Sequence, residues 1–243
     1  MKRTITLLLA LALLFAPCAC GKADGTSAET PQPVETAAPE MKEAPEEPTE
    51  HATEGPTEST PEEPTGSGSK VLVVYFSRTG EQYNVGVIDH GNTAVVAEMI
   101  GEATGADLYE ILPADDHYPM TYDELTDMAL EEQKDGARPA IAGELPDLTG
   151  FDTIFIGAPV WWGDWPMILY TFFESTPLEG KTLIPFSTHE GSGLSGFDRR
   201  LAAAYPDCTV ADGLAVRGAD AQNDPEKVRA SVSAWLDDLG LLG

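Results

Sequence analysis

Three short polar segments of this sequence could bind a ligand, and the first has the composition of an anion site. Ser77-Arg-Thr-Gly80 follows an apolar run, and Asn92 and Thr93 open the next helix-like segment. The N–H groups and the dipole at a helix start favour a phosphate, and neighbouring hydroxyl groups add donors. In the alternative interpretation, Ser77 and Thr79 only cap a turn. The segment is neither a Walker loop nor a Gly-x-Gly-x-x-Gly dinucleotide fingerprint.

The second segment, residues 158–164, places Trp161 and Trp162 side by side after an apolar run. Adjacent side chains in extended backbone point in opposite directions, so we expect at least one indole to meet solvent or a ligand. A flat aromatic ligand would stack on such a side chain. The alternatives are an aromatic lid or a patch that docks a partner.

The third segment, residues 187–193, combines two glycines with polar side chains. Gly191 and Gly193 allow a ligand to approach the backbone closely. The polar side chains belong to Thr188, His189, Glu190 and Ser192. A His beside a Glu is compatible with a catalytic pair, but the chain has no Gly-x-Ser-x-Gly nucleophile elbow, which argues against hydrolase chemistry.

Apolar runs predict the strands that must position these segments. β-Branched and aromatic residues indicate buried strands at 71–76, 107–111, 153–157 and 182–186, and a weak strand at 209–210 that residues 214–216 extend or repeat.

Apolar residues at helical spacing alternate with these runs. They predict helices at 92–103, 121–134 and 225–239, a helix marked by Leu194, Phe197 and Leu201, and a helix capped by Asp164 that has Pro166 in its first turn and ends at Phe173. Strands that alternate with helices predict one doubly wound α/β domain with a five-stranded parallel sheet. Ligands of such sheets bind beyond the carboxyl ends of the strands, where the three polar segments are expected to meet.

These segments resemble those of the flavodoxins, in the branch with a Pro-x-Trp-Trp-Gly loop. The matching stretches are Val-Val-Tyr-Phe-Ser-Arg-Thr-Gly (73–80), Ile-Gly-Ala-Pro-Val-Trp-Trp-Gly-Asp (156–164) and Pro-Phe-Ser-Thr-His-Glu-Gly-Ser-Gly (185–193), in that order. The resemblance covers residues 70–243. It implies a flavodoxin-like sheet of order 2-1-3-4-5 with helices on both faces, and FMN bound without a covalent bond.

The resemblance also implies which residues contact FMN. The phosphate would be held by Ser77, Arg78, Thr79, Gly80, Asn92 and Thr93. One side of the isoalloxazine would be lined by Pro159, Val160, Trp161, Trp162 and Gly163. The other side would be lined by Thr188, His189, Glu190, Gly191, Ser192 and Gly193. No catalytic residue is implied.

One departure from the family pattern concerns the phosphate segment. In many relatives Ser-x-Thr-Gly leads directly into Asn-Thr, whereas here residues 81–91 intervene. Asn92 and Thr93 remain candidates for the phosphate, and Tyr83 and Asn84 are alternatives that would project over the flavin edge. Arg78 has two candidate partners, the phosphate or a surface carboxylate.

Charge and cysteine content exclude several classes of function. The 243 residues include 41 Asp and Glu against 14 Lys and Arg, a formal charge of −27. A nucleic-acid-binding protein needs clustered Lys and Arg, so this class is excluded. Three cysteines, two of them within the first 20 residues, exclude a disulfide-stapled fold and a cysteine-built metal site. We expect the third, Cys208, to be a buried or half-buried thiol with no redox role.

Residues 1–20 have the pattern of a lipoprotein signal peptide. Lys2 and Arg3 precede an apolar run at 5–16, whose twelve residues would rise about 18 Å as a helix and so cannot cross a bilayer core of roughly 30 Å. The run leads into Ala-Pro-Cys-Ala-Cys-Gly, which resembles a lipobox. Cys20 is the better lipidation candidate because Pro17 precedes Cys18. The alternative is a plain signal peptide with incidental cysteines.

Residues 21–69 have the composition of a disordered tether. They contain 12 acidic residues, eight Pro, eight Thr and no aromatic residue. Such a segment cannot bury enough apolar surface to offset the entropy of ordering. We expect a spacer between a membrane anchor and the domain at 70–243. A specific cell-wall or partner-binding role is the alternative.

The expected function is electron transfer by an exported FMN protein that a lipid anchors to the membrane. The domain carries 29 acidic and 10 basic residues, a net charge of −19, which favours a basic redox partner. An NAD(P)H-dependent reductase of quinones or flavins is the main alternative, but it would need basic groups for the nicotinamide phosphates. A surface binding module without a cofactor is the alternative from another class.

Overall fold

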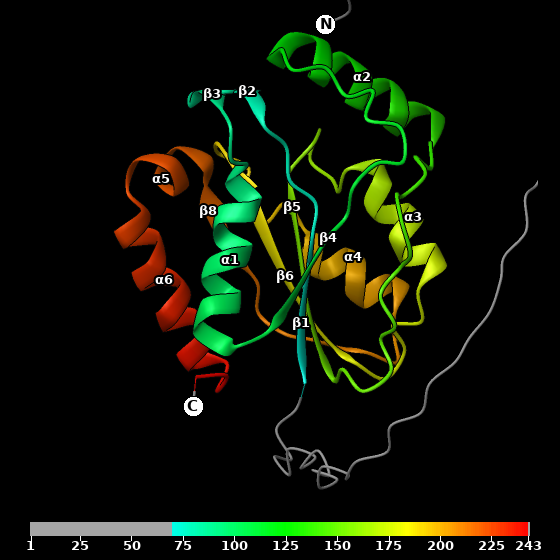
Figure 1. Cartoon of the computed structure of the whole chain (residues 1–243). Helices are drawn as coiled ribbons and strands as arrows, with labels where there is room; N and C mark the ends of the chain where they lie inside the picture. Colours follow the sequence, from blue (N-terminus) through cyan, green and yellow to red (C-terminus); the bar gives the residue numbers. More distant parts are fainter. Residues whose placement is uncertain (1–69, 243) are drawn as a thin grey trace, which may run out of the picture. The chain divides into compact units, whose positions relative to one another are not determined.

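The computed structural model describes residues 70–242, which form a parallel sheet between two layers of helices (Figure 1). The strands of this sheet are β1 (Val71–Tyr75), β4 (Asp107–Glu110), β5 (Thr153–Pro159), β6 (Thr182–His189), β7 (Thr209–Val210) and β8 (Leu214–Arg217). Their order is β4-β1-β5-β6-β7, and β8 pairs with β6 as well. Because β7 pairs with the start of β6 and β8 with its end, the two share one position. The predicted order 2-1-3-4-5 is confirmed, with the fifth strand in two pieces.

Alternate strand residues supply two separate apolar cores, one on each face of the sheet. Val73 and Phe155 pack under α1 (Asn92–Thr104), α5 (Gly218–Asn223) and α6 (Pro225–Asp238). Val74 and Ile154 pack on the other face, which α2 (Tyr122–Asp135), α3 (Met167–Ser175) and α4 (Phe197–Ala204) cover. All four of these strand side chains are fully buried. Burial of each contributes roughly 1.5–3 kcal/mol to folding.

The neighbouring strands β1 and β5 lead to helices on opposite faces of the sheet. β1 connects to α1 on one face and β5 connects to α3 on the other, so the two connections diverge at the carboxyl edge of the sheet (Figure 1). Divergent connections leave a crevice there, which is where doubly wound sheets bind their ligands.

The insertion at 81–91 contributes a small hairpin. It contains β2 (Gly80–Gln82) and β3 (Gly86–Ile88), which pair in antiparallel fashion. The Val85 N–H donates to the Gln82 carbonyl at 3.2 Å, and Asn84 adopts a left-handed φ of 60° in the turn. Asn tolerates this backbone better than most residues because its side chain can bond locally.

The predicted cap at Asp164 is wrong. Residues Trp161 and Asp164 exchange backbone hydrogen bonds at 3.0 Å and close a turn, and α3 begins only at Met167. The Asp164 carboxylate instead accepts from the Trp165 N–H and the Tyr170 hydroxyl, and it pairs with Arg200 at 2.7 Å. The short turn after β5 therefore replaces the first helical turn that was predicted.

Smaller differences concern element ends. α4 begins at Phe197 after a left-handed Gly196, so Leu194 precedes the helix. β5 and β6 extend two and three residues past their predicted ends, because β5 pairs with β6 as far as Pro159 and Thr188, and β8 pairs with β6 as far as His189. Cys208 is half-buried, and its thiol donates to the Leu178 carbonyl, as expected of a structural thiol.

Residues 70–242 contain neither a membrane-spanning helix nor a candidate metal cluster. Within residues 70–242, every helix falls short of the length and apolarity needed to span a membrane. The same residues contain no cluster of three or more His, Cys, Asp or Glu that could hold a metal ion. The predicted signal peptide, Cys20 and the tether at 21–69 lie outside the described residues.

Candidate functional site

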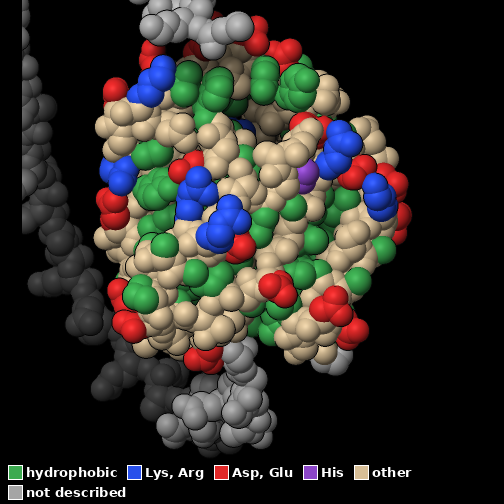
Figure 2. Space-filling view, turned by 180° about the vertical axis from the view of Figure 1, so that it is seen from behind, with side chains coloured by type: hydrophobic (Ala, Val, Ile, Leu, Met, Phe, Trp, Pro, Cys, Tyr) green, Lys and Arg blue, Asp and Glu red, His purple; other side chains and the backbone are tan. Residues whose placement is uncertain are grey.

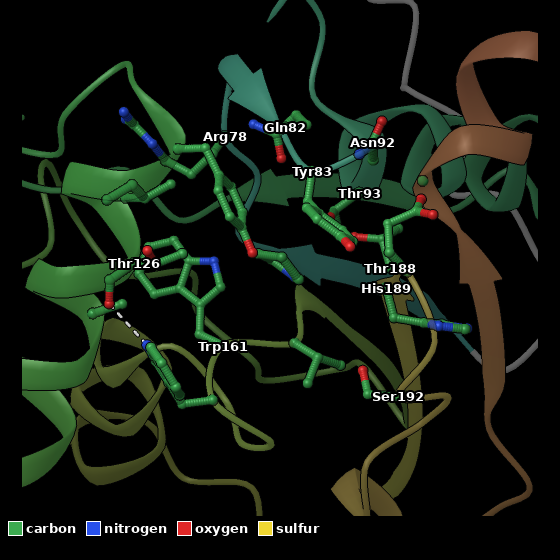
Figure 3. A pocket seen from close by; sticks show the side chains of 18 of the residues that line it. Arg78, Gln82, Tyr83, Asn92, Thr93, Thr126, Trp161, Thr188, His189 and Ser192 are labelled. Atoms are coloured by element: carbon green, nitrogen blue, oxygen red, sulfur yellow. Dashed lines mark hydrogen bonds between the residues drawn. The ribbon is translucent and has the colours of Figure 1, made fainter. Parts of the chain in front are cut away.

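A pocket of about 600 Å³ lies at the carboxyl edge of the sheet. Its volume is in the usual range for small-molecule sites. All three predicted segments line it, and side chains from the hairpin and α2 complete its walls (Figure 3). The predicted residues among its lining are Arg78, Asn92, Thr93, Pro159, Val160, Trp161, Trp162, Thr188, His189, Glu190, Gly191 and Ser192.

The N-terminus of α1 forms one end of the pocket. Within the described residues, the backbone N–H groups of Asn92 and Thr93 have no acceptor, so they are free to bind an anion. The Asn92 side chain is fixed by Gln222, whose amide donates to its Oδ1 at 2.9 Å. The hydroxyls of Thr93 and Thr188 lie 2.7 Å apart and are buried, which joins α1 to β6.

Ser77 supports this helix end and does not line the pocket. Its Oγ accepts from the Ala94 N–H at 3.0 Å, so Ser77 caps the start of α1 rather than a turn. Thr79, Gly80, Gly163 and Gly193 also lie outside the lining. The hairpin begins at Gly80, so the compact phosphate loop of many relatives is split into two parts here, as the insertion at 81–91 predicts.

Arg78 lines the pocket but already has a partner. Its side chain is only 8 % exposed, and it donates to Asp116 at 2.9 Å and to the Tyr118 carbonyl at 2.9 Å. Its Nε is buried and has no partner among the described residues. A buried N–H without an acceptor is costly, so Arg78 retains one donor that a ligand could satisfy.

The two tryptophans diverge, as the sequence predicts. Trp161 packs inward, edge-on against Phe76 and Tyr118 at centroid distances of 5.5 and 5.4 Å. Trp162 is 53 % exposed, and its Nε1 donates to the Thr126 carbonyl of α2 at 2.8 Å (Figure 3). Its φ of 49° is rare for a large residue, so the loop is held in a specific backbone conformation.

His189 is a neutral hydrogen-bonding group at the rim of the pocket. Burial lowers the pKa of its imidazole, and nearby Arg217 acts in the same direction while Glu190 opposes it. The Gly191 N–H donates to Nδ1 at 2.8 Å. Since Nδ1 is an acceptor, the ring proton lies on Nε2, which makes Nε2 a donor.

Glu190 is occupied by protein partners. Its carboxylate accepts from the Ala219 N–H of α5 at 2.7 Å and pairs with Arg217 at 3.1 Å. A catalytic pair with His189 is therefore not formed, because the two side chains bond in different directions.

Seven lining residues were not among the predicted site residues. They are Gln82, Tyr83, Tyr122, Leu125, Thr126, Ala129 and Gly218. Only Tyr83 was a candidate from the sequence, as an alternative residue that would project over the flavin edge. Four of the others belong to α2, whose position over the pocket depends on long-range contacts, such as Glu81 Oε2 accepting from the Tyr122 N–H at 2.9 Å.

Comparisons with known proteins agree with this geometry. The flavodoxin family model matches residues 70–237. A candidate flavoprotein from Bacteroides eggerthii is 34 % identical, with a TM-score of 0.55 over 71 % of this chain and 99 % of that chain. A second, from Bacteroides uniformis, is 34 % identical, with a TM-score of 0.56 over 70 % and 99 %.

A flavoprotein from Lactobacillus acidophilus, solved in complex with FMN, is 22 % identical over 65 % of this chain and 97 % of that chain, with a TM-score of 0.49. A search of curated proteins found no match. The family match and the crevice with its three segments agree in order and position, so the chain belongs to the flavodoxin family, whose cofactor is FMN.

Proposed function

We propose that this protein is an FMN-dependent electron carrier, anchored by a lipid to the outer side of the cytoplasmic membrane. The observation that carries the redox part is the pocket, which joins an unpaired helix N-terminus to aromatic walls at the switch point of a flavodoxin sheet. FMN supplies the transfer of hydride or single electrons, and the protein supplies its position and surroundings.

The residues present fit FMN. The N–H groups of Asn92 and Thr93 would hold the phosphate, and Trp161, Tyr83 and Val160 offer apolar surface for a flat ring. The buried Arg78 Nε is a further donor without a partner among the described residues.

The charge around the pocket favours a carrier over an NAD(P)H-dependent reductase. Arg78 is the only Lys or Arg among the lining residues, and Asp116 neutralises it. Arg217, next to the lining residue Gly218, is paired with Glu190. A nicotinamide dinucleotide brings two or more further phosphate charges, and no unpaired cation of the lining is available to bind them.

An absorption spectrum of the purified full chain, before and after addition of FMN, tests the proposal. A bound flavin band that only dithionite or a reduced redox protein bleaches is the expected result. Rapid bleaching by NADH or NADPH would show the reductase instead. A colourless protein that does not respond to FMN would contradict both redox functions and leave a tethered binding module.

The lipid anchor needs a separate experiment, because its residues lie outside the described range. Cells that express the chain are grown with a radiolabelled fatty acid, and we expect the label in the wild type and in C18S but not in C20S. Label lost only in C18S would move the anchor to Cys18, and an unlabelled wild type would contradict lipidation.

A further inference from the structure

A row of touching aromatic rings leads from the pocket to the surface. Trp161, which lines the pocket, meets Tyr118 edge-on at 5.4 Å. Tyr118 is 4 % exposed, and the His117 ring stacks on it at 4.8 Å with an interplanar angle of 26°. The His117 side chain is 44 % exposed. The Tyr118 ring therefore lies between Trp161, which lines the pocket, and His117, which is exposed to solvent.

The carboxylate of Glu132 is positioned to accept the proton of the Tyr118 phenol. The phenol OH donates to Glu132 Oε2 at 3.2 Å, and the other carboxylate oxygen lies 3.6 Å from His117 Nε2. Glu132 is only 9 % exposed. Carboxylates are rarely buried to this extent, and α2 is otherwise rich in acidic residues. Burial raises the pKa of both groups, so Tyr118 is a protonated phenol beside a carboxylate that accepts a proton more readily than an exposed one.

This combination is specific to one tyrosine of the described structure. Among its ring contacts, Tyr118–Trp161 is the only one that joins a tyrosine to a tryptophan. Tyr170 also donates to a carboxylate, that of Asp164 at 3.0 Å, but its ring partner is Phe173. Tyr170 is therefore a natural control for Tyr118.

We propose that Trp161, Tyr118 and Glu132 form a redox relay that moves an oxidising equivalent from the pocket wall to the protein surface. A one-electron oxidant at the pocket removes an electron from the Trp161 indole and leaves its cation radical. Tyr118 returns one electron to Trp161 and passes its phenolic proton to Glu132. The products are neutral Trp161, a neutral tyrosyl radical and protonated Glu132. A one-electron donor that reaches the surface at His117 then reduces Tyr118, and Glu132 returns the proton.

The proton step explains why the carboxylate is buried there. Loss of an electron makes a phenol strongly acidic, so a base within hydrogen-bond reach removes the proton in the same step and avoids a high-energy cation. Arg78, which lies 5.3 Å from the centre of the Tyr118 ring, disfavours positive charge on that ring and adds to this requirement. The relay would discharge oxidising species formed beside a bound flavin, and in this use it rests on the proposed function.

Pulse radiolysis of the full chain without FMN tests the relay itself. Azidyl radicals oxidise tryptophan by one electron, and tryptophanyl and tyrosyl radicals have distinct absorption bands. All Trp and Tyr residues of the chain lie within residues 70–243, so the N-terminal segments add no such signal. We expect a tyrosyl signal to grow as a tryptophanyl signal decays, at a rate independent of protein concentration.

Three variants assign the signal. Tyr118→Phe and Trp161→Phe should each abolish the concentration-independent growth, whereas the control Tyr170→Phe should retain it. Glu132→Gln keeps a hydrogen-bond acceptor but removes the base, so the growth should slow by roughly 100-fold. Circular dichroism of each variant confirms that it folds.

The outcomes separate the relay from the proposed function. Unchanged radical transfer in a folded Tyr118→Phe variant, or no transfer in the wild type, would overturn the relay. An unchanged rate in Glu132→Gln would overturn the role of the carboxylate. None of these results depends on FMN, so a protein that fails to bind FMN but shows the transfer would contradict only the proposed function.

Discussion

Single residues around the pocket matter mainly because they allow two segments of the backbone to lie close together or hold them in that arrangement. Gly91 shows this most directly: a Cβ at this position would lie 2.1 Å from Ser77 Oγ and 2.7 Å from the Arg78 carbonyl oxygen. Its φ of −69° is ordinary, so the requirement for glycine comes from space and not from backbone conformation. The anion end of the pocket exists because α1 starts directly against Ser77 and Arg78, in the loop that follows β1.

Gly91→Ala should therefore weaken FMN binding. The added methyl must displace Ser77 or the start of α1, which we expect to cost about 1–3 kcal/mol of stability. Displacement of the Asn92 and Thr93 N–H groups should raise the Kd for FMN by about tenfold, measured by fluorescence titration. The control is Gly105→Ala at the other end of α1, where a left-handed φ of 70° makes the variant less stable but should leave the Kd unchanged. Equal effects of both variants on the Kd would contradict the argument.

The buried carboxyl of Glu132 should make stability depend on pH. Burial raises its pKa above that in the unfolded chain, although Tyr118 and His117 partly oppose the shift. Its favourable contribution is thus complete below the unfolded pKa and is lost as the pH rises through the folded pKa. Glu132→Gln cannot ionise, so the stability of this variant relative to wild type should increase as the pH rises above about 4, the pKa of an unperturbed Glu.

Urea unfolding at several pH values measures this difference. Glu131→Gln, one residue along α2 and exposed, is the matched control and should show no such trend. A stability difference that stays constant with pH in Glu132→Gln would show that the carboxyl is not perturbed by burial.

At the scale of elements, the hairpin and α2 form one wall of the pocket and hold each other in place. Glu81 of β2 accepts the first N–H of α2, the rings of Tyr83 and Tyr122 lie 5.5 Å apart, and Trp162 bonds to the Thr126 carbonyl. The N-cap residue of α2 makes no side-chain hydrogen bond to the helix. The carboxylate of Glu81 in the hairpin supplies the missing acceptor.

Glu81→Ala should loosen this wall without unfolding the domain. Loss of the acceptor should cost α2 about 1 kcal/mol, the usual effect of removing a helix cap. Hydrogen exchange of the α2 amides should become faster, and FMN should dissociate faster in stopped-flow measurements. Asp89→Ala removes a charge from the same insertion without touching α2 and serves as the control. Unchanged exchange in Glu81→Ala would mean that the hairpin does not anchor α2.

At the scale of the whole molecule, residues 70–243 carry a large excess of negative charge. Acidic side chains outnumber basic ones almost three to one in residues 70–243, and six Lys and Arg side chains are held in ion pairs. On the face shown in Figure 2, basic side chains lie close to acidic ones, in keeping with this pairing. We therefore propose that the net field attracts basic partners and repels anions.

Electron transfer to a small basic redox protein should depend strongly on salt. Screening shortens the reach of the field from about 30 Å at 0.01 M to about 3 Å at 1 M ionic strength. We expect the second-order rate constant to fall by about tenfold or more over this range. A neutral quinone acceptor is the control and should show little change. A salt-independent rate with the basic protein would rule out steering by charge.

The proposed tether should matter for reach and not for chemistry. Deletion of residues 24–66 retains Cys20 and the domain but removes most of the spacer. Electron transfer in cells should slow because the domain can no longer reach distant acceptors, whereas the absorption spectrum and Kd of the FMN complex should not change. Transfer at the full rate in the deleted protein would contradict a role in reach.

Local sequence pattern determined the strands, the helices and the edge of the sheet at which the pocket forms. β-Branched runs and helical spacing report burial, which depends on each segment's own composition, so β1, β5, β6, α1 and α6 were predictable. Tertiary contacts decided the rest: Ser77 bonds 17 residues away, Arg78 bonds 38 residues away, and α2 is placed by Glu81, 41 residues distant. A polar side chain bonds whichever partner the fold brings near. The sequence therefore identified 12 of the 19 residues that line the pocket, while only the folded chain brought in those of the hairpin and α2 and determined which residues keep free donors for a ligand.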